Sequence, residues 1–452
     1  MQNTGLNIAK FGGTSVANHA SMLNCAKIVL ANPKTKVVVV SASAGVTNFL
    51  VELAHRPMTQ QQIEQTIEQI EAIELAIFKA LGEPQDVGEK LQELLQSLKE
   101  MAFHEELLHR PDLQDALLSL GERMSSLLFA EVIVQLGGAA QNFDVRKVLR
   151  TDSTFGQGTP QLEQIRELSA QLLAPELADN IVVTQGFVGA DSDGNTTTLG
   201  RGGSDFTAAL LAEALDAATC EIWTDVIGVY TTDPRITDKA RPLPELSFEE
   251  AAEMATFGAK VLHPATMEPA LRQDIKVFVG SSKEPEKGGT WIVRDCEVEP
   301  AYRAITRRKE QVMVTVKTPE MMYAQGFLER VFAIIAKHKL SVDLVTTSEI
   351  SVSFTLDNPP NSVAERLNRE TVDELKEICE VSVEHGFDLV TVVGNNMHSE
   401  KGVSSRIFAA VANYNLRMIC FGANPHNMSF LVNEADSTEV VRDLHKQLFE
   451  NN

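Results

Sequence analysis

The sequence predicts an α/β protein with a central, mostly parallel sheet between helices, followed by two smaller α+β modules. Three observations lead to this prediction. Apolar strand-like runs alternate with helical periodicity over the first two thirds of the chain, two of these runs end in small-residue loops, and the last third contains a duplicated segment. The 452 residues suggest two or three domains at about 150 residues each.

The composition limits the partners that the protein can have. Sixty-two acidic residues against 40 basic residues give a net charge of −22, which argues against nucleic acid or an anionic membrane as the main partner. A small anionic substrate can still meet a local basic pocket. The five scattered cysteines form no C-x-x-C pair and no zinc spacing, and the chain has neither a secretory signal pattern nor an apolar run of about 18 residues. We therefore expect free thiols and a cytoplasmic location.

The first small-residue loop follows a short apolar run at residues 6–9. Gly12 and Gly13 allow a tight turn there, and Thr14 or Ser15 can cap the amphipathic helix that follows. Free N–H groups and a helix dipole favour an anion such as phosphate at such a corner, and Lys10 adds positive charge. A plain turn is the alternative, because the segment is neither a Walker loop nor a G-x-G-x-x-G pattern.

The second loop follows four consecutive valines at residues 37–40. Such a run predicts a parallel strand that is buried on both faces, and the small-residue loop 41–48 comes directly after it. The two strands and the helix between them form a βαβ unit. Ligands collect at the carboxyl ends of strands in open α/β sheets, so we expect both loops at one binding edge.

Residues 51–136 have a helical pattern and are expected to cover the sheet. Glu71 and Glu74 belong to a polar-faced helix of this region. Farther along, Gly121 and Glu122 precede an apolar helical face. Glu122 can present its carboxylate to a substrate ammonium, and a plain helix start is the alternative.

Strands are expected at residues 143–149 and 181–188, and the densest glycine and hydroxyl segment of the chain follows at 194–205. A helix is predicted directly after this segment, with Ser204 or Asp205 as its cap. The combination of glycines, hydroxyls, one arginine and one aspartate before a helix predicts a phosphate or carboxylate site.

The stretch 220–235 is expected to be a strand that runs into a polar loop, and it contains Tyr230 and Arg235. Tyr230 can stack on a base, and the Arg235 guanidinium offers a fork of donors to phosphate. Lys260 lies alone between an alanine-rich helix and a proline, and the strand 275–279 closes this part of the chain.

The last third of the chain contains an internal repeat. Residues 326–354 align without gaps with residues 402–430, and each copy has the β-α-β-β-α-β, ferredoxin-like order. The second copy ends after its last helix, and its missing strand can be residues 302–306, which precede the first copy. We therefore expect the first module, 310–386, to be inserted into the second, 300–309 plus 387–452, after a catalytic domain at 1–295.

Five motifs in order resemble those of the aspartokinase family, and the repeat resembles tandem ACT modules. The motifs are KFGGTSV from Lys10, SASAGVTN from Ser41, TTTLGRGGSD from Thr196, WTDVIGVYTTDPR from Trp223 and ATFGAKVLHPAT from Ala255. The resemblance implies an amino-acid-kinase fold. The length and the first repeat copy resemble the monofunctional, lysine-sensitive class.

The resemblance implies phosphorylation of the side-chain carboxylate of L-aspartate by ATP with Mg²⁺, the first step of lysine, threonine and methionine biosynthesis. No general base is needed, because the attacking carboxylate is already ionised at neutral pH. The residues implied in catalysis are Lys10, Asp205 and Lys260. Those implied in ATP binding are Lys10, Phe11, Gly12, Gly13, Thr224, Asp225, Tyr230, Arg235, Lys260 and Val261. Those implied in aspartate binding are Ser41, Ala42, Thr47, Glu122, Arg201 and Ser204. No protein ligand of Mg²⁺ is assigned.

The first ACT copy resembles a lysine-binding module. The residues implied are Met321, Phe327, Leu328, Ser341, Val342, Asp343, Thr347, Ser348 and Glu349. Asp343 and Glu349 can receive an ammonium, whereas the second copy has Ile419 and Pro425 in their places, which favours one effector site per chain. The resemblance also implies a homodimer through the ACT modules, with a tetramer possible. An inactive amino-acid sensor built on the ACT pair is the alternative function, and intact Lys10, Asp205 and Lys260 argue against it.

Overall fold

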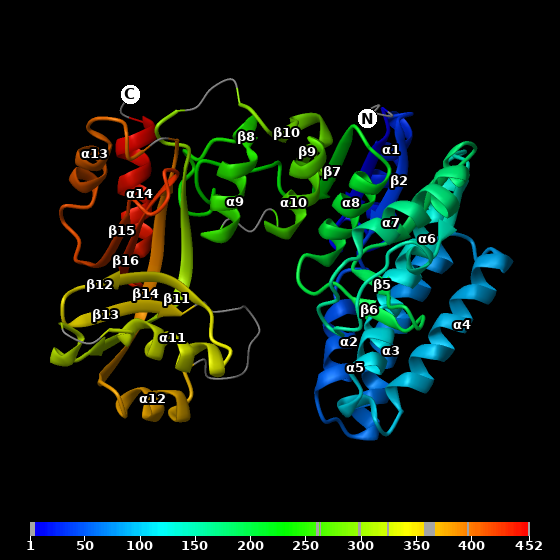
Figure 1. Cartoon of the computed structure of the whole chain (residues 1–452). Helices are drawn as coiled ribbons and strands as arrows, with labels where there is room; N and C mark the ends of the chain where they lie inside the picture. Colours follow the sequence, from blue (N-terminus) through cyan, green and yellow to red (C-terminus); the bar gives the residue numbers. More distant parts are fainter. Residues whose placement is uncertain are drawn as a thin grey trace. The chain divides into compact units, whose positions relative to one another are not determined.

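The computed structural model describes residues 5–258, 262, 264–296, 300–322, 325–356, 367–395 and 397–450, and the chain divides into two compact units (Figure 1). The N-terminal unit comprises residues 1–229, 242–252 and 260–296. The C-terminal unit comprises residues 230–241, 253–259 and 297–452. Segments 230–241 and 253–259 therefore pack with the C-terminal unit, although the sequence prediction places them in the catalytic domain 1–295.

The N-terminal unit is built on an eight-stranded sheet of order β3-β4-β2-β1-β7-β9-β10-β8. Strands β3 to β9 of this order are mutually parallel, and only β10 runs antiparallel to its neighbour β9. The mostly parallel sheet predicted from the sequence is therefore confirmed. The strands are β1 Asn7–Phe11, β2 Thr35–Val40, β3 Ala140–Phe143, β4 Ile181–Gln185, β7 Thr219–Thr224, β8 Glu245–Ser247, β9 Lys276–Ser281 and β10 Gly289–Val293.

Helices cover both faces of this sheet. Ala9 and Phe11 of β1 belong to one core with α1 to α6, while Lys10 between them points to the opposite face, where α8 packs on β1 and β7. In Figure 1, α3 and α4 run side by side at the edge of the unit. The helices are α1 His19–Ala31, α2 Val46–His55, α3 Gln60–Ala80, α4 Gln85–Ala102, α5 Pro111–Leu118, α6 Leu120–Gln135, α7 Leu162–Leu168, α8 Gly203–Ala214, α9 Phe248–Thr256 and α10 Pro264–Gln273.

Two predicted helix starts are wrong. Helix α1 begins at His19, and its N-cap is Asn18, whose side chain accepts a hydrogen bond from the Ser21 N–H. The glycine turn therefore ends several residues before the helix, and neither Thr14 nor Ser15 caps it. Helix α8 begins at Gly203 after a left-handed Gly202, so Ser204 and Asp205 lie in its first turn and do not cap it.

Two predicted strands differ from the structure: the strand expected at 143–149 is wrong, and the one expected at 181–188 is shorter. Strand β3 ends at Phe143, where the prediction starts, and a short 3₁₀ helix occupies Val145–Lys147. The run 181–188 is broken after β4, because Phe187 has a φ of 69°. The chain then continues as a small hairpin, β5 Val188–Ala190 with β6 Thr196–Thr198.

The C-terminal unit contains a six-stranded antiparallel sheet of order β12-β13-β11-β14-β16-β15 (Figure 1). Two long strands, β11 Ala304–Lys317 and β14 Glu380–Val393, run through its centre. The other strands are β12 Val342–Thr347, β13 Ser351–Leu356, β15 Leu416–Phe421 and β16 Asn427–Asn433, and the helices are α11 Phe327–Lys337, α12 Arg369–Lys376, α13 Val403–Ala410 and α14 Ser437–His445.

The two long strands divide their pairing between the repeat copies. Residues 304–308 of β11 pair with 389–393 of β14, which in turn pairs with β16. Residues 312–317 pair with β13 and with 380–384. Each copy also has its own apolar core. An inserted module requires that strands are shared in this way. The module boundaries, 310–386 and 300–309 plus 387–452, stay a prediction.

Two further observations concern the cysteines and the apolar character of the helices. All five cysteines are free thiols, as expected from their spacing. Among the described residues, no helix has both the length and the apolar character needed to cross a membrane.

Candidate active site

The loops that follow β1 and β2 lie against each other at the carboxyl edge of the sheet, as predicted. The Ser41 N–H donates to the Phe11 carbonyl oxygen at 3.1 Å. A Cβ atom on Gly13 would lie 2.9 Å from the Ala42 carbonyl oxygen, so only glycine permits this approach.

One of the two expected backbone donors in the first loop is already engaged. The Gly12 N–H donates to the Trp223 carbonyl oxygen at 3.1 Å and continues the pairing of β1 with β7. The N–H groups of Gly13 and Thr14 have no acceptor among the described residues. Gly13, rather than both glycines, can therefore donate to an anion from this loop.

Lys10 and Asp205 form the central ion pair of the site. The Lys10 Nζ lies 2.5 Å from the Asp205 Oδ1, and Lys10 is only 8% exposed. Gly186 brings α8 close enough for this pair, since a Cβ there would lie 2.5 Å from the Ser204 Cβ. The pair fixes a lysine ammonium beside the first turn of a helix, which is a position suited to a phosphoryl group.

A chain of hydroxyl groups links three neighbouring loops at the same edge. The Ser15 and Ser282 hydroxyls are 2.6 Å apart, and the Ser282 hydroxyl donates to the Thr224 carbonyl oxygen at 3.1 Å. The Thr224 hydroxyl donates to the exposed Asp225 carboxylate. Sequence reasoning missed the roles of Ser15 and Ser282, because a hydroxyl contact between residues so far apart leaves no local signal.

Glu122 is buried at the first turn of α6 and is 4% exposed. Burial raises the pKa of its carboxyl to about 8, against the opposing effects of the Ala42 backbone N–H and the Lys10 charge. A Cβ on Gly121 would lie 2.8 Å from the Ala42 Cβ, so this glycine lets α6 approach the second loop. The structure thus brings Glu122 and Ala42 together, as the predicted aspartate site requires.

The other residues predicted for aspartate lie around this pair of loops. The Ser125 hydroxyl of α6 donates to the Ser41 carbonyl oxygen at 2.7 Å. Thr47 is exposed in the first turn of α2, Arg201 is exposed just before α8, and Ser204 is partly buried in the first turn of α8.

Asp115 supports the glycine-rich segment and was missed from the sequence. Its carboxylate accepts hydrogen bonds from the Thr198 N–H at 2.8 Å, the Thr198 hydroxyl at 2.9 Å and the Gly156 N–H at 2.8 Å. Burial raises its pKa, and these three donors oppose the increase. The available signal was the position of an acid among Leu113, Leu117 and Leu118, which indicates a buried carboxylate.

Tyr230 and Arg235 belong to the C-terminal unit. The Arg235 side chain is 86% exposed and pairs with Asp233, with 2.7 Å between Nη2 and Oδ2. The guanidinium is the main cause that holds the pKa of Asp233 below its usual value. Lys260 and Val261, both predicted for the phosphates, lie outside the described residues.

The residues predicted for lysine surround α11 and β12. Phe327 is buried, and Met321 packs on the same core. The Asp343 carboxylate already pairs with Arg308, at 2.9 Å between Oδ2 and Nη1. The Ser348 hydroxyl lies 2.7 Å from the Ser351 hydroxyl. Exposed side chains complete the set: Leu328, Ser341, Thr347 and Glu349, with Val342 partly buried.

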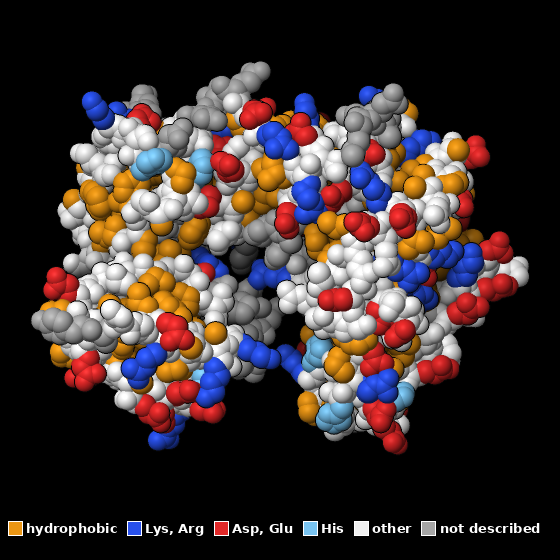
Figure 2. All heavy atoms as spheres, in the orientation of Figure 1, with side chains coloured by type: hydrophobic (Ala, Val, Ile, Leu, Met, Phe, Trp, Pro, Cys, Tyr) orange, Lys and Arg blue, Asp and Glu red, His pale blue; other side chains and the backbone are white. Residues whose placement is uncertain are grey.

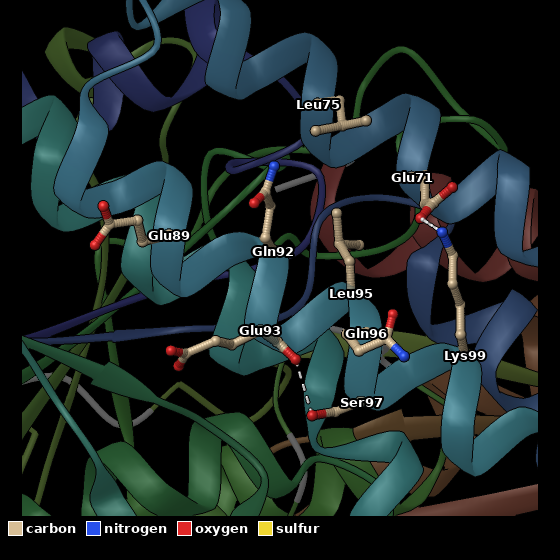
Figure 3. Close-up of a pocket in the computed structure, with 9 residues that line it drawn as sticks. All are labelled: Glu71, Leu75, Glu89, Gln92, Glu93, Leu95, Gln96, Ser97 and Lys99. Atoms are coloured by element: carbon tan, nitrogen blue, oxygen red, sulfur yellow. Dashed lines mark hydrogen bonds and ion pairs between the residues drawn. The ribbon is translucent and has the colours of Figure 1, made fainter.

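Two further features of the molecule do not contribute to this site. An open hollow of about 800 Å³ between α3 and α4 is lined by acidic and amide side chains, among them Glu71, whose carboxylate pairs with Lys99 at 2.7 Å (Figure 3). None of the predicted site residues lines it.

Within the described parts of the chain, no cluster of three histidine, cysteine, aspartate or glutamate side chains could hold a metal ion.

The fold and the anion-binding edge define an amino acid kinase. The amino acid kinase family matches residues 5–281, and an ACT domain matches residues 390–448. Lysine-sensitive aspartokinase 3 of Escherichia coli is 47% identical over 98% of this chain and 99% of its own length. The chain belongs to the aspartokinase family.

Two solved structures are similar over the whole chain. E. coli aspartokinase III in complex with aspartate and ADP, in the R-state, has a TM-score of 0.89 at 46% identity and covers 98% of this chain and 100% of its own. The same enzyme with lysine and aspartate, in the T-state, has a TM-score of 0.85 at 46% identity, with 99% and 100% covered.

Proposed function

We propose that this protein is an aspartate kinase, which transfers the γ-phosphoryl group of ATP to the side-chain carboxylate of L-aspartate and gives 4-phospho-L-aspartate and ADP. The observation that carries the proposal is the buried Lys10–Asp205 pair, which lies at the sheet edge where the β1 and β2 loops meet. The similar E. coli enzyme, whose structure contains aspartate and ADP, supports the choice of substrates.

The chain's own groups act on the transferred phosphoryl group by charge and position. Lys10 neutralises the oxygens of this group, and Asp205 holds the Lys10 ammonium in place. The free Gly13 N–H donates to a phosphate oxygen. Positioning and neutralisation suffice, because the attacking carboxylate is already ionised.

Mg²⁺ is proposed to arrive with the nucleotide. The described residues contain no cluster of three protein ligands, and Mg²⁺ commonly keeps water and phosphate oxygens as its main ligands. Asp205 pairs with the Lys10 ammonium, and it serves to orient Lys10. The metal would supply further neutralisation of the phosphate charge.

L-Aspartate is held, in this proposal, between the second loop and α6. Glu122 receives its ammonium, since the buried carboxyl is stabilised as an anion when a positive charge arrives. Arg201 and Ser204, at the start of α8, bind the carboxylates from the side of Lys10. Ser41, Ala42 and Thr47 complete the aspartate site from the second loop.

Lysine is the proposed effector, bound at the first ACT module, since the similar E. coli protein is lysine-sensitive. Glu349 is exposed and available for an ammonium, whereas Asp343 would share its carboxylate with Arg308. We also propose a homodimer through the ACT modules. Hydrophobic side chains gather over the region of β12 and β15 in Figure 2, and Val345, Ile419 and Phe421 are exposed on these two strands.

A coupled ADP-release assay tests the proposed function. The full chain with ATP, Mg²⁺ and L-aspartate is expected to release ADP, and added L-lysine is expected to reduce the rate. Turnover with glutamate or UMP in place of aspartate would move the protein to another branch of the amino acid kinases. Lysine binding with no phosphoryl transfer would support the inactive sensor.

A further inference from the structure

A second buried acid, Glu74, lies on α3, which packs against the Glu122 helix α6, and it has no role in the proposed mechanism. It is 0% exposed on the face of α3 that also buries Ile70 and Ile77. Neither of its carboxylate oxygens has a hydrogen-bond partner among the described residues. The buried hydroxyl of Ser43, in the loop after β2, likewise has none.

Glu74 differs from every other acid on its helix. Figure 3 shows Glu71 in the open hollow between α3 and α4, where its carboxylate pairs with Lys99. Glu68, also on α3, is exposed. A carboxyl group that is buried away from solvent and has no ion-pair partner is costly to keep in its ionised form. Its position therefore favours a protonated acid.

Three helices pack against α3, namely α2, α4 and α6, and each carries charged groups. Helix α6 contributes Glu122, whose charge acts on Glu74, and Lys10 of β1 acts in turn on Glu122. Helix α4 contributes Lys99, which pairs with Glu71, and α2 contributes the exposed pair of Glu52 and Arg56. The buried charge that acts on Glu74 is therefore that of Glu122, which is the proposed ammonium acceptor.

We propose that Glu74 is a proton-holding positioning residue for the ammonium subsite at Glu122, so that binding of L-aspartate is linked to release of a proton. The proposal rests on the function proposed above. Because burial raises the pKa of both carboxyl groups, Glu74 and Glu122 each favour the protonated form until a cation arrives. When an ammonium reaches Glu122, the added positive charge favours ionisation of Glu74 as well, and its carboxyl O–H bond breaks with the proton passing to solvent.

The electrostatics support this coupling between the two carboxyl groups. Burial raises the pKa of Glu74 to about 8, Ser43 opposes the increase, and the Glu122 charge adds to it. Two buried carboxyl groups that share a region titrate as a pair, and a nearby cation lowers the pKa of both. Linkage then requires the affinity for aspartate to rise with pH wherever binding releases a proton.

Titration calorimetry of the full chain with L-aspartate, between pH 7 and 9 and in buffers of different ionisation enthalpy, tests the proposal. Wild type should release more protons per aspartate bound than Glu74→Gln, and its affinity should rise several-fold more steeply with pH. Glu68→Gln, the same change at an exposed position of α3, should match the wild type.

Ser43→Ala provides a second variant. Loss of the facing hydroxyl removes an effect that lowers the pKa of Glu74, so proton release should move to higher pH. Equal proton counts and equal pH slopes in wild type and Glu74→Gln would overturn the proposal, as would an unchanged pH midpoint in Ser43→Ala if Glu74→Gln does not fold. Failure of the wild type to bind aspartate would instead overturn the proposed function.

Discussion

At the scale of single residues, the site depends on charges that are kept away from water. Lys10 and Asp205 neutralise each other, whereas Glu122 has no such ion pair among the described residues, and its anion is stabilised by the Ala42 and Glu122 backbone N–H groups and by the Lys10 charge. Burial therefore has opposite consequences for the two groups. It strengthens the ion pair and penalises the isolated carboxylate.

Lys10→Ala is expected to lower turnover at least about 100-fold, because removal of one preorganised charge from a phosphoryl-transfer site costs roughly 3 kcal/mol or more of transition-state stabilisation. The coupled ADP-release assay measures this loss. Lys34→Ala changes an exposed lysine between α1 and β2 and serves as the control. Normal turnover of Lys10→Ala would mean that the glycine loop is a plain turn.

Glu122→Gln is expected to weaken aspartate binding, seen as an increase of tenfold or more in KM, since it removes the ammonium acceptor. It should also change stability with pH. The folded pKa of about 8 exceeds the ordinary value of 4.5, so the wild type loses stability as pH rises from about 5 to 8. The free energy of unfolding changes by at most about 1.4 kcal/mol per pH unit for one titrating group.

Thermal melts of Glu122→Gln and wild type between about pH 5 and 8 measure the direction of this change in stability. The melting temperature of the variant relative to wild type should be higher at pH 8 than at pH 5. A difference that stays constant with pH would contradict a buried, proton-holding Glu122.

At the scale of elements, the site is made by close approaches between loops that only glycine allows. Gly13 meets the Ala42 carbonyl group, Gly121 meets the Ala42 side chain, and Gly186 meets Ser204 of α8. Each contact draws one element toward the carboxyl edge of the sheet. The anion corner therefore owes more to loop packing than to the N-terminus of α1, which begins only at His19.

Two adjacent glycines allow a matched test. Gly13→Ala places a Cβ 2.9 Å from a backbone oxygen, whereas Gly12→Ala places one 3.6 Å from the flexible end of Lys10. Overpacking against backbone should destabilise Gly13→Ala by about 1–3 kcal/mol. Denaturant unfolding should detect this loss, with Gly12→Ala close to the wild type. Equal stability of the two variants would contradict the close contact of the two loops.

The sequence could predict the elements that depend on local pattern. The four valines of β2, the alternation of strands and helices, and the repeat that leads to β11 and β14 each have a period or an identity that a single chain displays. The predicted starts of α1 and α8 were wrong. Several residues near each start have side chains that can cap a helix, and the conformation of the folded turn determines where the helix begins. Glu74 was placed on a polar-faced helix, although its spacing from Ile70 and Ile77 gives it the buried face.

At the scale of the whole molecule, two units with separate cores carry the proposed chemistry and the proposed regulation. The segment 230–241, which contains Tyr230 and Arg235 of the predicted nucleotide site, packs with the C-terminal unit. The Thr231 hydroxyl lies 3.0 Å from the buried His445 Nε2 of α14, and the Thr231 carbonyl oxygen accepts from the Ile305 N–H of β11 at 2.7 Å. Residues from before the ACT repeat and from within it therefore share one core, and the division of labour between units does not follow the order of the chain.

Glu349→Ala tests the regulation that this organisation is proposed to serve. The exposed carboxylate belongs to the first ACT module, so its loss should weaken lysine inhibition and leave the uninhibited rate unchanged. A coupling free energy of about 1–3 kcal/mol between two sites corresponds to roughly 5- to 150-fold in affinity, which sets the expected increase in the lysine concentration for half inhibition. Asp343→Ala should act in the same direction, with a smaller effect because Arg308 already occupies that carboxylate. Glu370→Gln, an exposed acid on α12 of the same module, is the control. Unchanged inhibition of both variants by lysine would remove the effector site from this module.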